Sequence, residues 1–306
     1  MSQPPVLLVV GPTAAGKTNL SLDLAERLDG EIVNTDAMQL YRGMDIGTAK
    51  LPVEERRGVP HHLLDVLDVH EAASVAEFQG WARSAIEGIR GRGRTPVLVG
   101  GSALYNRAVV DQFTFPGTDP ALRAEVEAEV ERDGLPAAYD RLAALDPDAA
   151  AAIEPGNARR VVRALEVIAL TGEPFSATLP RQAYALDGVV QIGIDIPRDV
   201  VDERIARRVD AMWETGLLEE VRDLLPRGLR ESRTAAAAIG YRQAIDQLDG
   251  VLSGEQARAD TATATRRFVR RQLAWWRKDA RIAWLPAGDP DLVAQALSVV
   301  ARNLEP

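Results

Sequence analysis

The 306-residue sequence predicts an α/β fold, with a parallel β-sheet flanked by helices and an all-helical domain inserted into it. Apolar runs at 5–10, 31–34 and 96–99 alternate with helical patterns, which indicates strands joined by helical crossovers. From 119 to 172 the sequence is helical and charged, without a strand pattern. Strand character returns at 189–196, so the helical segment divides the sheet-forming part of the chain in two.

The first strand, PVLLVV at 5–10, is a continuous apolar run of the kind that forms a buried parallel strand. Helices are expected at 18–28 and 75–90, where apolar residues recur at helical spacing. The segment 35–65 is rich in glycine, proline and polar residues and is longer than a connection requires, which favours a functional loop. After the insert we expect helices and a last strand, at 200–215, 217–225, 235–247, 255–279 and 282–285.

These patterns divide the chain into a core and an insert. The core is expected to comprise 1–115 and 185–306, including the C-terminal helices, and the inserted helical domain 116–184. The link into the insert is FTFPGTDP at 113–120, and the link out of it lies near 178–187.

Composition excludes several classes of site. The chain has no cysteine, which rules out disulfides, thiolate zinc sites and cysteine nucleophiles. No apolar stretch approaches the roughly 18 residues of a membrane span, and the first apolar run lacks the basic residues that precede a signal sequence. We therefore expect a cytoplasmic protein without membrane contact. The net charge of −9 disfavours general nucleic-acid binding, although TRRFVRRQLAWWRK at 265–278 is strongly basic.

The segment GPTAAGKT at 11–18 is a phosphate-binding loop, or P-loop. It matches G-x-x-x-x-G-K-[ST], follows a strand and opens a helix. Backbone N–H groups of such a loop converge on phosphate oxygens at a positive helix N-terminus. Lys17 adds a cation, and the Thr18 hydroxyl can ligate Mg²⁺. The sheet is therefore expected to be P-loop NTPase-like. The residues predicted here to bind a diphosphate or triphosphate group are Gly11, Pro12, Thr13, Ala14, Ala15, Gly16, Lys17 and Thr18.

The P-loop alone indicates an enzyme that uses ATP or GTP, such as a kinase acting on a small substrate, or a non-catalytic nucleotide switch. One expected part is missing, because the third strand ends in Gly100-Gly101 without the aspartate that completes many magnesium sites beside a triphosphate. Asp36, which follows the second strand, is the better-placed carboxylate.

Segments along nearly the whole chain resemble the tRNA dimethylallyltransferases, which prenylate an adenosine of tRNA. The resemblance is to the bacterial type, since the zinc-finger extension of the eukaryotic enzymes is absent. The matching segments are GPTAAGKT (11–18), NTDAMQLYRGMDIGTAK (34–50), PHHLLD (60–65), VGGSALY (99–105), RRVVRALEV (159–167), RIARRVDAMWETGLLEEV (204–221), AIGYRQ (238–243) and RRQLAWWR (270–277).

The resemblance changes the meaning of the P-loop. It implies that the loop and Mg²⁺ hold the diphosphate of dimethylallyl diphosphate, whose carbon–oxygen bond breaks. Arg208, with Arg204 one helical turn earlier, falls where the family has a diphosphate-binding arginine. The acceptor is N6 of the adenosine just 3′ of the anticodon, a poor nucleophile that needs Asp36 as general base. Asp36, Thr18 and Arg208 form the expected catalytic set.

The resemblance also implies contacts with the anticodon stem-loop of tRNA. Gln39 would give a bidentate amide contact to adenine, or alternatively pack its own loop. Ala37 departs from the serine usual in the family, and Ser102 stands where threonine is common. The expected tRNA-binding residues are Asp36, Ala37, Met38, Gln39, Ser102, Arg123, Arg159, Arg160, Val161, Val162, Arg163, Gly240, Tyr241, Arg242, Arg270, Arg271, Gln272 and Arg277.

Three further expectations concern side chains and assembly. Trp275 and Trp276 are predicted to pack in the core and not to stack on bases. His61 and His62 are adjacent in an extended segment and point opposite ways, so we expect structural roles for them. We also expect the protein to act as a monomer.

Overall fold

The computed structural model describes residues 3–178 and 182–304. The chain forms two compact units, one holding the chain up to Val110 and from Leu186 onward, the other holding Asp111–Ala185. The predicted link out of the insert, near 178–187, falls partly on 179–181, outside the described residues.

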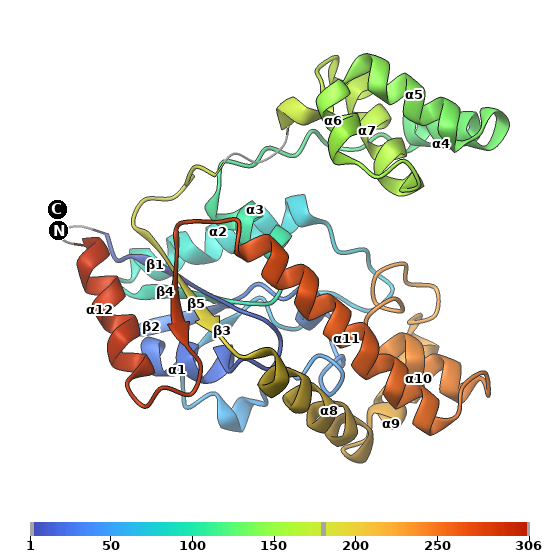
Figure 1. Cartoon of the computed structure of the whole chain (residues 1–306). Helices are drawn as coiled ribbons and strands as arrows, with labels where there is room; N and C mark the ends of the chain where they lie inside the picture. Colours follow the sequence, from blue (N-terminus) through green and yellow to red (C-terminus); the bar gives the residue numbers. More distant parts are fainter. Residues whose placement is uncertain (1–2, 179–181, 305–306) are drawn as a thin grey trace. The chain divides into compact units, whose positions relative to one another are not determined.

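The first unit is built on a parallel sheet, which confirms the predicted fold class (Figure 1). The described strands lie in the order β3-β2-β4-β1-β5-β6, with every pairing parallel. β1, β2 and β4 are almost wholly buried, as expected for strands covered on both faces. The strand bounds are β1 Val6–Val10, β2 Gly30–Asn34, β3 His61–His62, β4 Thr95–Val99, β5 Val189–Asp195 and β6 Ile282–Pro286.

Helices cover this sheet and extend beyond it (Figure 1). The short strand β3 and two 3₁₀ helices, η1 (Ala37–Leu40) and η2 (Val53–Glu55), lie in the long predicted loop. Within the part of the chain that the structure describes, no helix is both long and apolar enough to cross a membrane. The helices are α1 Lys17–Arg27, α2 Val75–Gly91, α3 Ala103–Val110, α8 Arg198–Glu214, α9 Leu217–Leu224, α10 Tyr241–Leu248, α11 Gly254–Trp276 and α12 Leu292–Leu304.

Two helix predictions differ from the structure. The helix expected over 235–247 begins only at Tyr241, because Gly240 has φ +94° and the residues before it form turns. The alanine-rich sequence 235–238 favours a helix locally, but tertiary structure overrides that propensity. The helix α12 was not predicted; it packs against α1 and the neighbouring strands β5 and β6.

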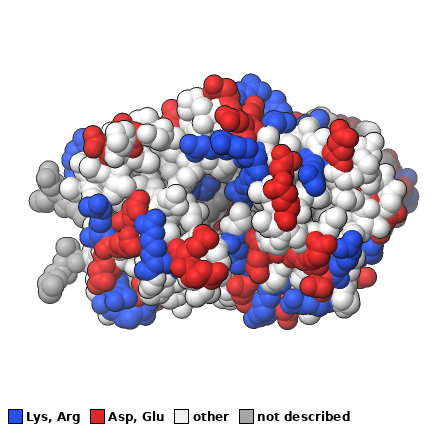
Figure 2. Space-filling view, turned by 90° about the horizontal axis from the view of Figure 1, so that it is seen from below, with Lys and Arg blue, Asp and Glu red and all other residues white. Residues whose placement is uncertain are grey.

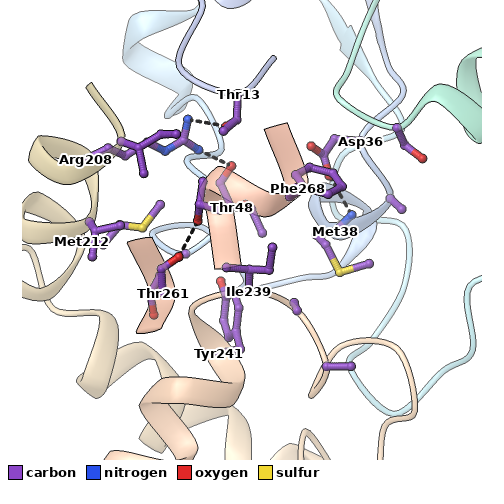
Figure 3. Close-up of a pocket in the computed structure, with 18 of the residues that line it drawn as sticks. Thr13, Asp36, Met38, Thr48, Arg208, Met212, Ile239, Tyr241, Thr261 and Phe268 are labelled. Atoms are coloured by element: carbon purple, nitrogen blue, oxygen red, sulfur yellow. Dashed lines mark hydrogen bonds between the residues drawn. The ribbon is translucent and has the colours of Figure 1, made fainter. Parts of the chain in front are cut away.

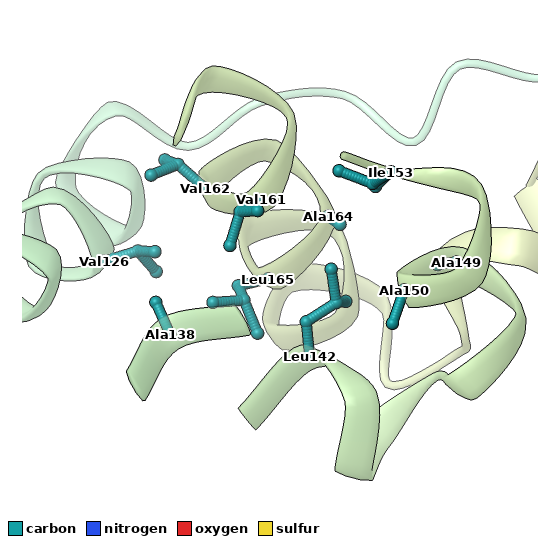
Figure 4. Close-up of a cluster of buried hydrophobic side chains, with 10 residues drawn as sticks. All are labelled: Val126, Ala138, Leu142, Ala149, Ala150, Ile153, Val161, Val162, Ala164 and Leu165. Carbon is teal, nitrogen blue, oxygen red and sulfur yellow. The ribbon is translucent and has the colours of Figure 1, made fainter. Parts of the chain in front are cut away.

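The second unit is a helical domain with its own core (Figure 4). Its helices are α4 Pro120–Asp133, α5 Leu135–Leu145, α6 Pro147–Ala152 and α7 Ala158–Thr171, followed by the 3₁₀ helix η3 Phe175–Thr178. The two chain segments at its root pair with each other, since Asp111 and Tyr184 form an antiparallel bridge and Gln112 N donates to Ala183 O at 2.8 Å. The buried side chains are those of Val126, Ala138, Leu142, Ala149, Ala150, Ile153, Val161, Val162, Ala164 and Leu165.

Candidate active site

The P-loop connects the buried end of β1 to the first turn of α1. Gly16 is the N-cap residue of α1 and has φ +99°, a conformation that side chains rarely adopt. Lys17 Nζ donates to the carbonyl oxygens of Gly11 at 2.9 Å and Pro12 at 2.8 Å. Burial lowers the pKa of Lys17 to about 8, although the Asp36 carboxylate acts to raise it. The loop thus places a desolvated cation at a helix N-terminus, which favours an anionic ligand.

Two arginines of α8 contact the P-loop. Arg208 Nη1 donates to the Thr13 hydroxyl at 3.2 Å, and its Nη2 donates to the Thr48 carbonyl at 3.3 Å (Figure 3). Arg204 donates to the carbonyl of Ala14 at 3.2 Å. The pKa of Arg208 is lowered by burial, and the nearby Asp36 carboxylate offsets only part of this effect. The structure therefore brings both predicted arginines to the predicted phosphate loop.

Asp36 lies just beyond the carboxyl end of β2 and caps η1. Its Oδ1 accepts from Met38 N at 3.0 Å, and Asn34 fixes its main chain through bonds of 2.9 and 3.1 Å. No described residue donates a hydrogen bond to Oδ2. One carboxylate oxygen is thus used to hold the loop, and the other remains available to accept a proton.

A polar cavity and an apolar cavity share part of their lining. The polar cavity, of about 330 Å³, is lined by P-loop residues including Lys17 and Thr18. The apolar one, of about 400 Å³, is lined by Ile205, Val209 and Met212 of α8 and by the turn before α10. Both are lined by Thr13, Asp36, Thr48, Arg208 and Phe268. Figure 3 shows these five residues in the apolar cavity.

Both signs of charge occur on one face of the molecule. Figure 2 shows this face, which is hollowed near its centre, with Lys and Arg side chains beside the hollow and acidic side chains distributed over the same face. This pattern differs from the continuous basic surface of a general nucleic-acid binder.

The polar cavity suits Mg²⁺ only with help from a substrate. Among the described residues no group of three His, Cys, Asp or Glu side chains could hold a metal ion. The Thr18 side chain lines the cavity, and Asp36 lies on the same lining. Because Mg²⁺ is commonly held by one or two protein oxygens together with phosphates and waters, these residues fit it as partners of a diphosphate.

Comparisons with known proteins agree on one family. The family model described as IPP transferase matches residues 39–279. The tRNA dimethylallyltransferase of Nocardioides sp. is 61% identical over 98% of this chain and 97% of its own length. The chain belongs to the IPP transferase family.

Solved structures lead to the same IPP transferase fold. The tRNA isopentenylpyrophosphate transferase of Bacillus halodurans is 43% identical, with a TM-score of 0.72 over 98% of both chains. A eukaryotic dimethylallyltransferase, described as acting on tRNA, is 27% identical with a TM-score of 0.83, over 97% of this chain and 78% of its own.

Several residues predicted to contact tRNA in this IPP transferase line the two cavities. Ala37, Met38, Ser102, Tyr241 and Arg271 line the apolar one. Gln39 and Gln272 line the polar one.

Both of these glutamines bind the main chain. Gln39 Nε2 donates to the carbonyl of Thr48 at 3.1 Å, so the loop-packing alternative describes its contact. Gln272 donates to Gly101 O at 2.6 Å and accepts from Thr13 N at 3.3 Å. Gln272 therefore ties α11 to the P-loop.

Two of the arginines at the C-terminal end of α11 contact other side chains of the first unit. Arg270 is exposed, and the Arg271 guanidinium lies 5.9 Å from the centre of the Phe268 ring. Arg277 forms an ion pair with Asp195 and lies 4.1 Å from the Trp284 ring centre. These contacts occupy Arg277 within the first unit.

The prediction that both tryptophans of α11 are core residues is half wrong. Trp276 is 4% exposed, as predicted, but Trp275 is 48% exposed. Neighbouring helical residues point about 100° apart, so only one of the pair faces the core.

In the insert the predicted tRNA residues divide into three groups. Val161 and Val162 are buried in the core of the unit, so their side chains serve packing. Arg123 and Arg163 form ion pairs with the fully buried carboxylate of Glu166, at 3.7 and 3.0 Å. Arg159 and Arg160, at the start of α7, are exposed and make no ion pair with described residues.

Two further residues predicted to contact tRNA lie at α10, and the two histidines with predicted structural roles form β3. Gly240 precedes α10, and Arg242 is exposed on it. His62 Nε2 lies 2.6 Å from Glu31 Oε2, as a structural residue would. His61 lines the polar cavity, and burial lowers its pKa.

Sequence reasoning missed most of the apolar lining. Ile205, Val209 and Met212 were not proposed as site residues, yet they share one helical face with Arg208. That spacing around a predicted site arginine was the available signal. Thr48 and Phe268 carried no such signal, because only the folded chain brings them to Arg208.

Proposed function

We propose that the protein transfers the dimethylallyl group of dimethylallyl diphosphate to N6 of the adenosine just 3′ of the anticodon in tRNA. The observation that carries this proposal is that Asp36 and Arg208 line both a polar cavity at the P-loop and an apolar cavity beside it. The polar cavity suits a diphosphate and the apolar one a prenyl group. The names of the IPP transferase relatives support the same activity.

The reaction is a substitution at an allylic carbon. The carbon–oxygen bond of the donor breaks, and both of its electrons leave with the diphosphate. The N6 lone pair forms the new carbon–nitrogen bond, and the N6 proton passes to Asp36 Oδ2. Lys17, Arg208 and the P-loop N–H groups stabilise the charge on the leaving diphosphate. Thr18 would help to hold a Mg²⁺ ion bound with the donor, and that ion would add to the charge stabilisation of the diphosphate.

The apolar lining protects the reacting carbon from water. An allylic centre with cation character would be captured by water in an open site. Val209, Met212 and Ile239 present apolar side chains at the cavity where the prenyl group would lie. The acceptor base must leave its stack to reach Asp36, as is usual for enzymes that modify bases.

A labelling experiment tests the proposal. The protein is incubated with unmodified tRNA, Mg²⁺ and either labelled dimethylallyl diphosphate or γ-labelled ATP. We expect label in tRNA only from the prenyl donor, and loss of that label when the target adenosine is replaced by guanosine. Label from ATP alone, or from neither donor, would reject the proposal.

We also propose that the enzyme is cytoplasmic and acts as a monomer. Size-exclusion chromatography with light scattering should then give one chain per tRNA in the complex. A complex with two chains per tRNA would contradict this part of the proposal.

A further inference from the structure

The side chain of Glu220 on α9 holds a turn next to the candidate site without lining either cavity. Its carboxylate accepts four hydrogen bonds. The donors are Asp45 N at 3.0 Å, Ile46 N at 2.7 Å, Gly47 N at 3.3 Å and the Tyr241 hydroxyl at 2.5 Å. Charge-assisted bonds of this kind are about twice as strong as neutral ones, so the three that come from main-chain N–H groups fix the turn 45–47 firmly.

The turn leads directly into a residue that contacts the catalytic arginine. The carbonyl oxygen of Thr48 accepts from Arg208 Nη2 at 3.3 Å and from Gln39 Nε2 at 3.1 Å. Because Thr48 follows Gly47 directly, a shift of the turn moves this carbonyl. The orientation of the Arg208 guanidinium therefore depends on the turn.

The far side of the turn is anchored as well. The side chain of Lys50 is 4% exposed, and Nζ pairs with both Asp45 and Asp65 at 2.6 Å. It also donates to the carbonyl of Tyr41 at 2.8 Å. Lys50 and Glu220 thus hold Asp45 together, Lys50 through the carboxylate of Asp45 and Glu220 through its main-chain N–H.

Tyr241 packs closely against the same turn. A Cβ at Gly47 would lie 2.4 Å from Cε2 of the Tyr241 ring, so only glycine permits this close approach. Burial, and then the neighbouring Glu220 carboxylate, raise the pKa of Tyr241, so its hydroxyl stays protonated and donates. The phenol, which the sequence suggested as a tRNA contact, thus has its hydroxyl committed to Glu220.

We propose that Glu220 is a positioning residue: its carboxylate holds the turn 45–47 so that the Thr48 carbonyl orients Arg208 toward the diphosphate. The role of the diphosphate rests on the proposed function. The positioning itself is tested with inorganic diphosphate, independently of prenyl transfer.

The test compares Glu220→Gln with Glu219→Gln. The amide keeps the shape of the side chain but loses one acceptor oxygen and the charge. Glu219 is the matched control, because it is the neighbouring residue on α9, is 68% exposed and pairs only with Arg222 among the described residues. Calorimetry measures the affinity for inorganic diphosphate with Mg²⁺, and kinetics give kcat and KM for donor and tRNA.

We expect Glu220→Gln to weaken diphosphate binding by about tenfold or more, the effect of losing one or two charged hydrogen bonds. The kcat/KM for the donor should fall similarly, while the KM for tRNA stays unchanged. Glu219→Gln should change none of these. Unchanged diphosphate affinity in Glu220→Gln would overturn the proposal.

A double-mutant cycle with Arg208→Ala separates positioning from a general effect on folding. If Glu220 acts through Arg208, Glu220→Gln should change diphosphate affinity less than about twofold when Arg208 is already alanine. An equal loss in both backgrounds would mean that Glu220 does not act through Arg208.

Tyr241→Phe serves as a second, milder variant should Glu220→Gln fail to fold. It keeps the ring against Gly47 and removes a single donor to Glu220. We expect diphosphate affinity to weaken by about threefold, and an unchanged affinity would count against the proposal. If diphosphate binding responds as expected but no prenyl transfer occurs in the unaltered protein, the proposed function fails and the positioning role stands.

Discussion

Arg208 and the P-loop residue Thr13 are 195 positions apart in the sequence, yet Nη1 of the arginine lies 3.2 Å from the threonine hydroxyl. The helix α8 therefore contributes to the phosphate site that we propose at the P-loop. The proposed leaving-group site is thus formed by both core segments, one on each side of the insert in the sequence.

Asp36→Asn should lower kcat by about a hundredfold to ten-thousandfold, the usual contribution of a general base. The asparagine oxygen can still accept from Met38 N, so the cap of η1 and the loop should persist. Binding of tRNA, measured by filter retention, should change little. Weakened tRNA binding with normal single-turnover rates would mean that Asp36 positions RNA and does not take the proton.

Arg208→Ala should raise the KM for dimethylallyl diphosphate and lower kcat, since it removes a buried cation from the leaving group. We expect a loss of about a hundredfold in kcat/KM, comparable to removing one preorganised charge-stabilising donor. Arg207→Ala is the control, because Arg207 is the preceding residue and pairs on the surface with Glu203. Equal kinetics for the two variants would remove Arg208 from the site.

Diphosphate binding should weaken as the pH rises through about 8, the pKa of Lys17 in the free protein. Above that pH the ammonium loses its proton and no longer attracts the anion. Titration with inorganic diphosphate from about pH 6.5 to about pH 9.5 covers the ionisation of this lysine. Lys17→Arg keeps its charge, so the fall in affinity near pH 8 that the unaltered protein shows should be absent from this variant; identical profiles for the two proteins would contradict the assignment.

Lys17 should also make the free energy of unfolding depend on pH. Its pKa is about 8 when folded, against 10.5 for an unperturbed lysine, so the unfolded chain binds more protons between these values. The free energy of unfolding due to Lys17 should therefore rise with pH across that window. Urea unfolding of the unaltered protein and of Lys17→Met, at about pH 7.5 and about pH 10, should show the lysine becoming more favourable relative to methionine at the higher pH.

Glu31 should stabilise the sheet at neutral pH and lose that effect in acid. Burial raises its pKa, but hydrogen bonds from Arg92 and His62 outweigh burial and lower the pKa to about 2, from 4.5. The stabilisation is complete above 4.5 and disappears as the pH falls toward 2.

Glu31→Gln should cost about 3 kcal/mol near pH 7, as breaking a buried ion pair does, and much less near about pH 3. Urea unfolding at both pH values measures this loss of unfolding free energy, and Glu54→Gln, which changes an exposed residue, is the control. An equal cost at both pH values would mean that the effect is packing and not charge.

Arg160→Ala should weaken tRNA binding without loss of stability, because Arg160 is exposed and makes no ion pair with described residues. The slope of log K against log salt should fall by about one for each lost phosphate contact. Arg132→Ala, which removes an exposed arginine paired with Asp133, is the control. An unchanged slope in Arg160→Ala would remove it from the tRNA surface.

The sequence was sufficient for candidate site residues that lie within a contiguous motif or directly after a strand. The P-loop is a contiguous motif after a strand, so its placement at the end of β1 followed from the pattern alone. Asp36 followed from its position after the second strand. These predictions rested on residues close together in the chain.

The sequence was insufficient where contacts between residues far apart in the chain determine the role of a side chain. Nothing near Glu220 indicates that its carboxylate binds Asp45 N and Ile46 N, 175 and 174 residues away. The family resemblance implies a tRNA contact for Arg277, but its partner Asp195 lies in another element, far away in the sequence. Trp275 and Trp276 are chemically identical, and only the rotation of α11 against its neighbours separates them.

The pairing at the root of the insert has a consequence for how the chain folds. Because Asp111 bridges Tyr184, the insert brings its own two ends together. To the rest of the chain, a long intervening segment then behaves as a short one, and the loop-closure entropy of joining the two halves of the sheet is correspondingly reduced. Early folding of the insert would thus accelerate the docking of β5 beside β1.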